Sequence, residues 1–353
     1  MSASMPAARD ARMDAARAIA IVLVVLGHAR GIPGGFALLV FSFNVPLFFL
    51  VSGWVTTAYG RARSDAQAWA RVVRGLLLPY LGFFLLAYLY WLLTRHIGEK
   101  ALRWGALPWW DPLVGALQGN GPGLYVQPAL WFLPALALTT LAFRYLARQL
   151  SPLPLAALAA ILAWAWIAWF PPLGLRLPWG LDVLPVTLFF FACGAIVGRF
   201  NTRVRAFLEW KGTVPLLAMV WLPLAWVNGR VDVNMLRFGH WPPLFLLVAL
   251  LGAALVLCLA GWIQRWSAVQ WIGRNTLLIL GTHFPVFFVL SGIRSLAGVQ
   301  SPPGPGWALW VSVVALLAAV PLRRILMRWA PWMLGAEPAT RGPAVGMPEA
   351  GPR

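Results

Sequence analysis

A histidine and an arginine share one face of an apolar segment near the start of the chain, where both residue types are costly. In "DAARAIAIVLVVLGHAR", residues 14–30, Arg17 and His28 are eleven positions apart. A helix brings them onto one face, separated by a rise of roughly 16 Å, with Asp14 one turn before Arg17. A neutral imidazole can act as a general base, and a guanidinium is a permanent, forked cation. We expect a functional polar stripe; the alternative is that Arg17 reaches for the membrane surface while His28 makes a structural hydrogen bond.

A second apolar segment contains polar residues beside a proline. In "FSFNVPLFFLVSGW", residues 41–54, Pro46 interrupts the helical hydrogen-bond pattern near Asn44, and Ser52 and Gly53 follow. A broken helix of this kind is tolerated where it lines a cavity inside the protein. A packing kink with Ser and Gly at a helix contact is the alternative.

A second membrane-depth histidine occurs late in the chain. His283 lies nine residues after Arg274 in "GRNTLLILGTHFPVF", with Pro285 just beyond it. One such histidine is typical of a structural hydrogen bond. Two at similar depth on separate helices favour a cavity shared with His28.

The elements that must position these residues are membrane helices. The 353 residues are 61% hydrophobic and 11% charged, against about 25% charged in soluble domains. A bilayer core asks for roughly 20 apolar residues per helix. We predict an all-α, polytopic transmembrane bundle of about ten helices over residues 1–334, followed by a disordered cytoplasmic tail over 335–353. The expected helices cover 13–30, 36–59, 70–94, 125–147, 153–170, 181–199, 213–228, 241–262, 272–293 and 306–329.

The basic residues predict the orientation. When both termini are placed in the cytoplasm, 20 of the 28 Lys and Arg fall on the cytoplasmic side. This asymmetry is what the positive-inside rule expects, and it accounts for the net charge of +18 without nucleic acid. The eight on the other side are Arg30, Arg95, Lys100, Arg103, Arg176, Arg230, Arg237 and Arg294.

Several function classes lose support. None of the ten acidic residues lies in the middle of a predicted helix, where proton and cation pathways usually place them. No metal-ligand spacing, no G-x-S-x-G elbow and no P-loop is present. We therefore expect no metal, no serine hydrolase and no ATP-driven machine. Cys193 and Cys258 lie in apolar runs and predict no disulfide.

Six landmarks resemble the acyltransferase-three family of integral-membrane O-acyltransferases, and within it the fucose 4-O-acetylase-like branch. They run in family order from residue 12 to about 330. One departure is Asn44, where the family often has a histidine, so a base or a charge at that position is absent. The landmarks are Arg17-x10-His28, "PLFFLVSGW" at 46–54, "LPY" at 78–80, "ALWFLPAL" at 129–136, "NGRVDVN" at 228–234, and "IGRNTLLIL" at 272–280 with His283 following.

The resemblance implies transfer of an acyl group, usually acetyl from acetyl-CoA, to a sugar hydroxyl of a surface glycan or its lipid-linked precursor. The implied partners are acyl-CoA, the glycan or lipid-linked sugar, and membrane lipid, in a bacterial cytoplasmic (inner) membrane. His28 is then the general base or a transient acyl carrier. The expected catalytic set is His28, Arg17, His283 and Asn44; the donor set is Arg17, Asp14, Arg71 and Arg74; the acceptor set is Asp232, Asn234, Trp131 and Ser52.

Two other functions remain open from the sequence. A transporter or flippase for a polar or lipid-linked solute would also place His and Arg in the membrane and break its helices. A structural partner in an envelope complex is the third possibility, but it leaves the stripe from Arg17 to His28 unexplained.

Overall fold

The computed structural model describes residues 10–60, 64–97, 99–210, 212–299 and 301–335. Most of the tail predicted from residue 335 onward therefore lies outside the described residues. The same is true of six basic residues that the orientation argument placed on the cytoplasmic side: Arg9, Arg61, Arg63, Lys211, Arg341 and Arg353.

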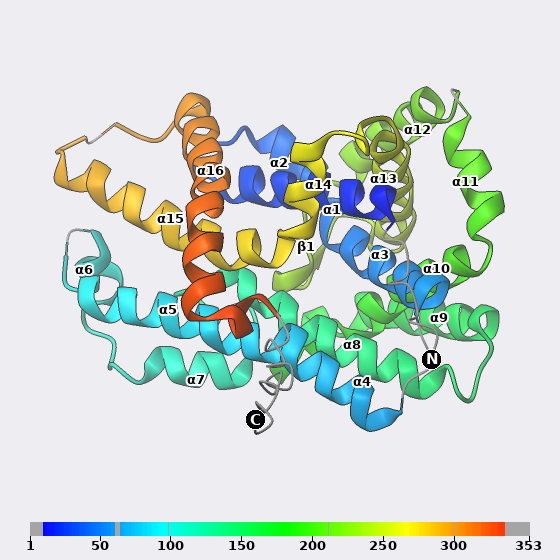
Figure 1. The fold of residues 1–353 in the computed structure, drawn as a ribbon, viewed down its shortest axis with the longest axis horizontal. Helices are drawn as coiled ribbons and strands as arrows, with labels where there is room; N and C mark the ends of the chain where they lie inside the picture. Colours follow the sequence, from blue (N-terminus) through cyan, green and yellow to red (C-terminus); the bar gives the residue numbers. More distant parts are fainter. Residues whose placement is uncertain (1–9, 61–63, 98, 211, 300, 336–353) are drawn as a thin grey trace, which may run out of the picture.

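The protein is almost entirely helical, and a helix occupies each of the ten predicted segments (Figure 1). Within the described ranges, eight helical stretches are long and apolar enough to cross a membrane, or nine if the bent pair α11–α12 counts as one span. The helices are α1 Ala11–His28, α2 Gly34–Phe41, α3 Asn44–Tyr59, α4 Asp65–Val72, α5 Leu78–Thr94, α6 Glu99–Trp104, α7 Asp111–Gln118, α8 Phe132–Leu146, α9 Pro152–Trp169, α10 Leu184–Arg199, α11 Asn201–Glu209, α12 Thr213–Asn228, α13 Pro242–Ile263, α14 Ser267–Arg274, α15 Thr276–Leu296 and α16 Pro305–Trp329.

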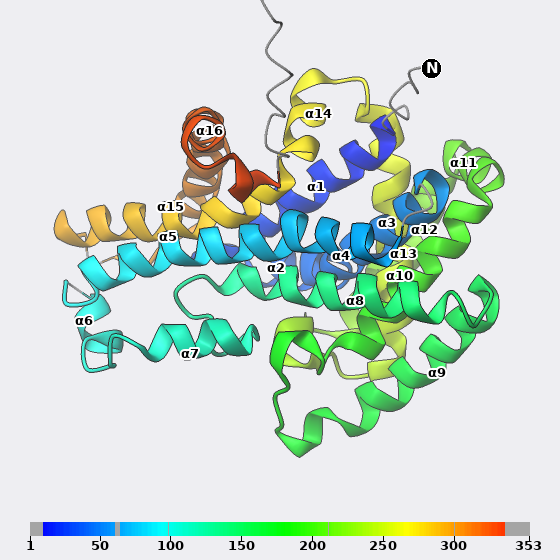
Figure 2. The same ribbon diagram turned by 60° about the horizontal axis from the view of Figure 1, so that its bottom comes forward.

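Helix α1 lies inside the bundle, against α3, α13, α14, α15 and α16 (Figures 1 and 2). It begins at Ala11 because the Asp10 carboxylate caps it, accepting the backbone N–H of Arg12 at 3.0 Å. It ends at His28, two residues before the end of the predicted segment. Because α1 carries three charged residues, its composition alone does not mark it as a span.

Glycines let α3 and α10 pack with their backbones in contact. A Cβ on Gly53 would lie 1.9 Å from the carbonyl oxygen of Phe191, and one on Gly194 would lie 1.9 Å from that of Leu50. No larger side chain fits at either position. Gly53 therefore serves a helix contact, which is the packing alternative for this segment.

Two predicted helices are each divided in the structure. The 36–59 segment breaks at Ser42 and Phe43, between α2 and α3, and Pro46 lies in the first turn of α3, where its missing N–H costs little. The 272–293 segment breaks at Asn275, between α14 and α15. The expectation that Arg274 and His283 share one helix is therefore wrong, and Arg274 belongs to the short α14.

The helix predicted over 70–94 starts earlier, at Asp65, and contains a π-helical turn. This turn covers Val73–Leu77, between α4 and α5. It holds Arg74 and Gly75 just before the "LPY" landmark. A π-helical turn inserts an extra residue into a helix and is frequent at functional sites.

The two long connections fold into small elements of their own. Residues 95–124 form α6 and α7, and Tyr88 fixes them by donating its hydroxyl to the carbonyl of Trp109 at 3.0 Å. Residues 228–240 contain a short antiparallel hairpin, β1 Val231–Asp232 and β2 Arg237–Phe238. The expected all-α fold is thus confirmed apart from this hairpin.

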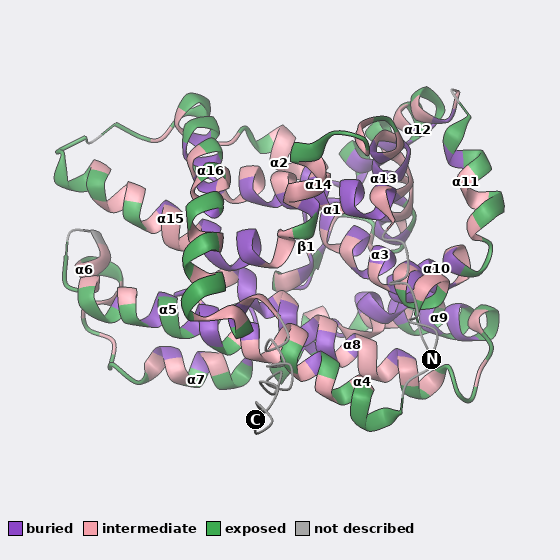
Figure 3. Ribbon diagram, viewed as in Figure 1, coloured by how far each residue is buried: buried purple, intermediate pink, exposed green. Residues whose placement is uncertain are grey.

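Many large apolar side chains are exposed. Exposed residues lie mainly on the outer parts of the helices, and buried residues gather toward the centre (Figure 3). Leu93 is 79% exposed and Leu102 is 91% exposed. A water-soluble protein of this size rarely exposes so many contiguous apolar groups. The surface is that of a multi-pass membrane protein.

Candidate active site

The two histidines that the sequence predicts at similar membrane depth are in contact. His28, the last residue of α1, places its Nδ1 3.4 Å from Nε2 of His283 on α15. Their rings are nearly parallel, with centroids 5.4 Å apart. Phe284 packs against both rings, at 4.9 Å from His28 and 4.7 Å from His283. His283 is fully buried, whereas His28 is partly exposed.

The hydrogen bonds of this pair define which ring nitrogen is basic. Nδ1 of His283 lies 3.0 Å from the carbonyl oxygen of Ile279. A carbonyl only accepts, so in the neutral ring Nδ1 carries the proton and Nε2 has the lone pair. That Nε2 accepts from Nδ1–H of His28, which leaves the lone pair of His28 on its own Nε2. His28 is thereby oriented as a base in the way a second group usually orients a catalytic histidine.

A buried glutamine supports the helix that carries His283. Pro285 has no N–H, so the carbonyl of Gly281, four residues earlier, lacks its helical partner. The side chain of Gln127 donates to this carbonyl at 2.8 Å. Gly281 itself accommodates the ring of Phe83, which a Cβ would meet at 2.3 Å.

His28 lines a cavity of about 310 Å³ between the ends of α1, α5, α15 and α16 and the short α6. Its walls are mainly aromatic and aliphatic. Three basic residues also line it: Arg30, Lys100 and Arg103. Its size is that of a small-molecule site.

The other end of α1 carries a cluster of charges. Asp14 is 2% exposed, and its carboxylate lies 3.7 Å from Arg17 and 3.4 Å from Arg274 of α14. The two helices approach closely because Gly273 packs on the backbone of Asp14, where a Cβ would lie 1.9 Å from the carbonyl oxygen.

Beside this cluster lies a second, polar cavity of about 680 Å³. Arg274 lines it together with Trp271 and Asn275 of the α14 region, and with Arg323 of α16, whose Nε donates to Asn275 at 2.7 Å. The two cavities therefore lie at opposite ends of α1.

Asn44 opens α3 and is 1% exposed. Among the described residues, none makes a hydrogen bond to either atom of its side-chain amide. Just before Asn44, the chain lies close to His28, as shown by the ring centroids of Phe41 and His28, which are 5.8 Å apart. A buried amide without partners is costly and is typical of a site rather than of a core.

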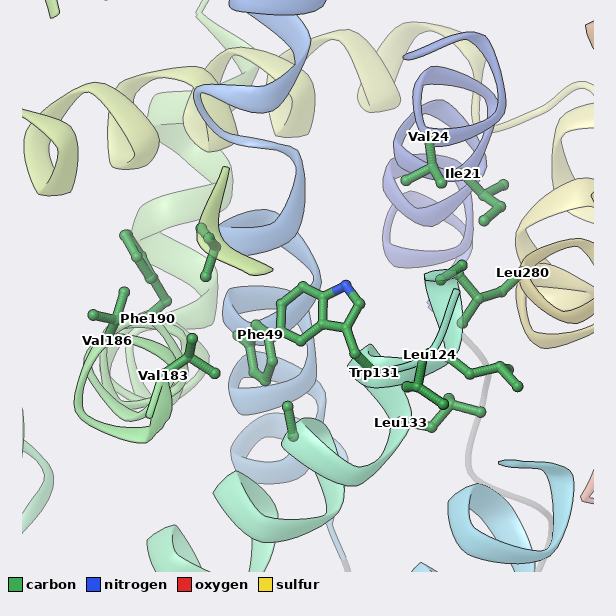
Figure 4. Packing of buried hydrophobic residues seen from close by; sticks show 14 of the residues in the cluster. Ile21, Val24, Phe49, Leu124, Trp131, Leu133, Val183, Val186, Phe190 and Leu280 are labelled. Carbon is green, nitrogen blue, oxygen red and sulfur yellow. The ribbon is translucent and has the colours of Figure 1, made fainter. Parts of the chain in front are cut away.

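The other residues predicted from "PLFFLVSGW" and "ALWFLPAL" have roles within the bundle. The Ser52 hydroxyl donates to the carbonyl of Phe48 in its own helix at 2.7 Å. Trp131 is 7% exposed and packs among Phe49, Leu124 and Leu133 (Figure 4). Neither residue lines either cavity.

The predicted acceptor residues Asp232 and Asn234 lie in the hairpin. The Asp232 carboxylate accepts the backbone N–H of Met235 at 3.1 Å, and burial raises the pKa of this carboxyl. The backbone carbonyl of Asn234 accepts from Arg176, which also contacts Asp182 at 2.6 Å. These groups connect the segment before α10 to the hairpin and do not line the His28 cavity.

The predicted donor residues Arg71 and Arg74 are exposed, on α4 and the π-helical turn. Neither lines either of the two cavities. Among the described residues, no group of three His, Cys, Asp or Glu side chains is placed to hold a metal ion.

Sequence reasoning missed two features of this site. The need for a donor such as Gln127 was predictable from the sequence, because a proline inside a helix always leaves one carbonyl without its helical partner. The basic lining of the His28 cavity was not, since Arg30 and Lys100 are 70 residues apart in the sequence.

Comparison with known proteins gives one result. The model of the acyltransferase-three family, described as an acyltransferase domain, matches residues 10–324. No curated protein and no solved structure matches the chain.

Proposed function

The chain belongs to the acyltransferase-three family, and on that premise we propose that it moves a short acyl group, acetyl in the first instance, from acyl-CoA to a sugar hydroxyl. The acceptor is a cell-surface glycan or its lipid-linked precursor, as in the fucose 4-O-acetylase-like branch. The membrane is the bacterial cytoplasmic membrane, with the Asp14 end of α1 facing the cytoplasm.

The contact between His28 and His283 at the wall of a cavity carries this proposal. A sugar hydroxyl is a weak nucleophile until a base removes its proton. Nε2 of His28 has the lone pair for this step, and His283 holds the ring in the required tautomer. Both hydrogen bonds then run in the same direction: His28 donates to His283, and His283 donates to the carbonyl of Ile279.

In the mechanism we propose, the acceptor hydroxyl gives its proton to His28 as its oxygen bonds to the acyl carbonyl carbon. The C–S bond then breaks, and His28 returns the proton to the departing thiolate, so that the imidazole is neutral again. Asn44, whose buried amide has no hydrogen-bond partner among the described residues, does not line the His28 cavity itself; we assign its N–H to the developing oxyanion on the strength of that free amide.

The cluster at the other end of α1 suits the donor. Acyl-CoA supplies the activated acyl group together with a purine and several phosphates. Arg274 and Arg323 offer cations, and Trp271 a flat ring, in one open cavity. Arg17 lies one turn further along α1 toward His28, held by Asp14. Arg71 and Arg74 are assigned to the approach of the donor, and Asp232 and Asn234 to that of the acceptor.

The experiment measures transfer of label from [¹⁴C]acetyl-CoA to a panel of sugars and alkyl glycosides by purified protein in lipid nanodiscs. His28→Ala should lower kcat by about 10²–10⁴-fold, the usual contribution of a general base. The matched control is His240→Ala, because His240 is exposed in the hairpin connection and lines neither cavity. Full activity in a folded His28→Ala protein would refute the mechanism.

A further inference from the structure

The His28 cavity has walls suited to an apolar or ring-shaped group. Phe284, Phe287 and Phe288 of α15 line one side, and Trp307 of α16 and Trp104 of α6 line others. Phe288 and Trp104 pack edge to face, with centroids 6.4 Å apart. Aromatic faces of this kind bind both sugar rings and acyl chains.

A lysine is fixed into this apolar wall. Nζ of Lys100 donates to the hydroxyl of Tyr90 at 2.8 Å and to that of Thr94 at 3.0 Å, and it lies 4.1 Å from the centre of the Tyr90 ring. Both hydroxyls are neutral, so these contacts orient the ammonium without neutralising it. An ammonium has three donors, which leaves one for a ligand.

The charge of the cavity is one-sided. Arg30 and Arg103 line it with Lys100, and Arg294 lies 4.8 Å over the ring of Trp307 at its edge. No carboxylate lines it among the side chains that the structure describes. These four are half of the eight basic residues assigned to the side of the membrane where positive charge is normally scarce. A topology signal therefore does not explain them.

We propose that the acceptor bound next to His28 carries an anionic group, a phosphate or a carboxylate, close to the hydroxyl that is acylated. This proposal rests on the acyl-transfer function above. The anion lies against Lys100, Arg103 and Arg30, while the aromatic wall holds the ring or chain attached to it. The cations thus select the acceptor and hold its hydroxyl at His28.

The first test is direct binding in nanodiscs of zwitterionic lipid, with dodecyl β-D-glucuronide and the neutral dodecyl β-D-glucoside as probes. Loss of one hydrogen bond to a charged group is worth about 10–100-fold in affinity. We expect the glucuronide to bind at least tenfold more tightly, and Lys100→Gln/Arg103→Gln to abolish the difference. Arg237→Gln removes an exposed charge from the hairpin on the same side and should leave the preference unchanged.

Competition by free glucuronic acid distinguishes a water-soluble anionic acceptor from a lipid-linked one. Competition as strong as that of the dodecyl compound would assign a water-soluble acidic sugar, whereas weak competition would assign a lipid-linked one. Equal binding of the charged and neutral glycosides would overturn the proposal.

Transfer of labelled acetyl to the same two glycosides tests the acyl-transfer function separately from the anionic acceptor. If both glycosides are acetylated with equal kcat/KM, acyl transfer stands and the anionic acceptor is refuted. If neither is acetylated while the charge-dependent binding persists, the anion site stands and the acyl-transfer assignment to such sugars fails.

Discussion

The hydrogen bond from Gln127 to the carbonyl of Gly281 predicts that the stability effects of substituting Gln127 and Pro285 depend on each other. Gln127→Met removes the donor to a carbonyl that Pro285 has already deprived of its helical partner. Methionine retains the volume, and the other amide atom, Oε1, is buried and has no hydrogen-bond partner in the part of the chain that the structure describes. The variant therefore loses one hydrogen bond and little else.

The expected cost is about 1–2 kcal/mol, the range of an interhelical hydrogen bond in a membrane protein and of a buried polar group left unsatisfied. For a chain of 353 residues it lowers the melting temperature by about 1–1.5 °C per kcal/mol. Acyl transfer should fall as well, because Gly281 lies two residues before His283.

The proline provides the decisive control. In Pro285→Ala the new backbone N–H can reach the Gly281 carbonyl, so Gln127 is no longer needed there. Gln127→Met should then cost little, and the double-mutant cycle should give a coupling of about 1 kcal/mol or more. Intrinsic tryptophan fluorescence during thermal unfolding in one detergent measures all four proteins. Additive effects of the two substitutions would refute this account of the kink.

Three further predictions concern other parts of the molecule. Gly53→Leu should prevent close packing of α3 on α10, because even a Cβ would lie 1.9 Å from the carbonyl oxygen of Phe191; we expect loss of the monodisperse peak in size-exclusion chromatography, and a normal profile would contradict the packing argument. Asp14→Asn should weaken the link between α1 and α14 by up to about 3 kcal/mol, because two cations lose their buried carboxylate; weaker acetyl-CoA binding in calorimetric titration should accompany it, and unchanged binding would remove Asp14 from the donor site. Asp232→Asn should keep the free energy of unfolding within about 0.5 kcal/mol of wild type at low pH, because an amide oxygen also accepts the N–H of Met235. Burial raises the pKa of the Asp232 carboxyl, so its ionisation costs stability as the pH rises through that pKa, and the variant should gain on wild type from acidic to neutral pH in the melting curves.

Membrane helices were accessible from the sequence because each must bring about 20 apolar residues into the bilayer and satisfy its own backbone. That requirement acts on each segment separately, so a helix appears in every predicted segment. Helix ends and breaks were less accessible. The break at Asn275 contains no proline, and the nearby Gly273 could not be recognised as a packing residue because its partner, the backbone of Asp14, is about 260 residues away in the sequence.

In the candidate site, too, the sequence predicted some features and not others. His28 and His283 were each recognisable as polar residues in apolar runs, and their contact follows from two helices that share a depth. Trp131 belongs to a recognisable landmark, but its burial among Phe49 and Leu124 is decided by neighbours from other helices. The basic cavity combines residues from five elements, and no local pattern reports such a convergence.

The π-helical turn at Val73–Leu77 has a consequence for how this helix tolerates changes in length. The turn amounts to one inserted residue, absorbed without interrupting the helix that runs from Asp65 to Thr94. Deleting Gly75, whose missing side chain faces open space, would restore regular α-helix. Everything before it would turn by about 100° and advance by about 1.5 Å relative to Tyr80. A single codon would thus redirect Arg74 together with all of α4, Arg71 included, while Leu78–Thr94 stay in place.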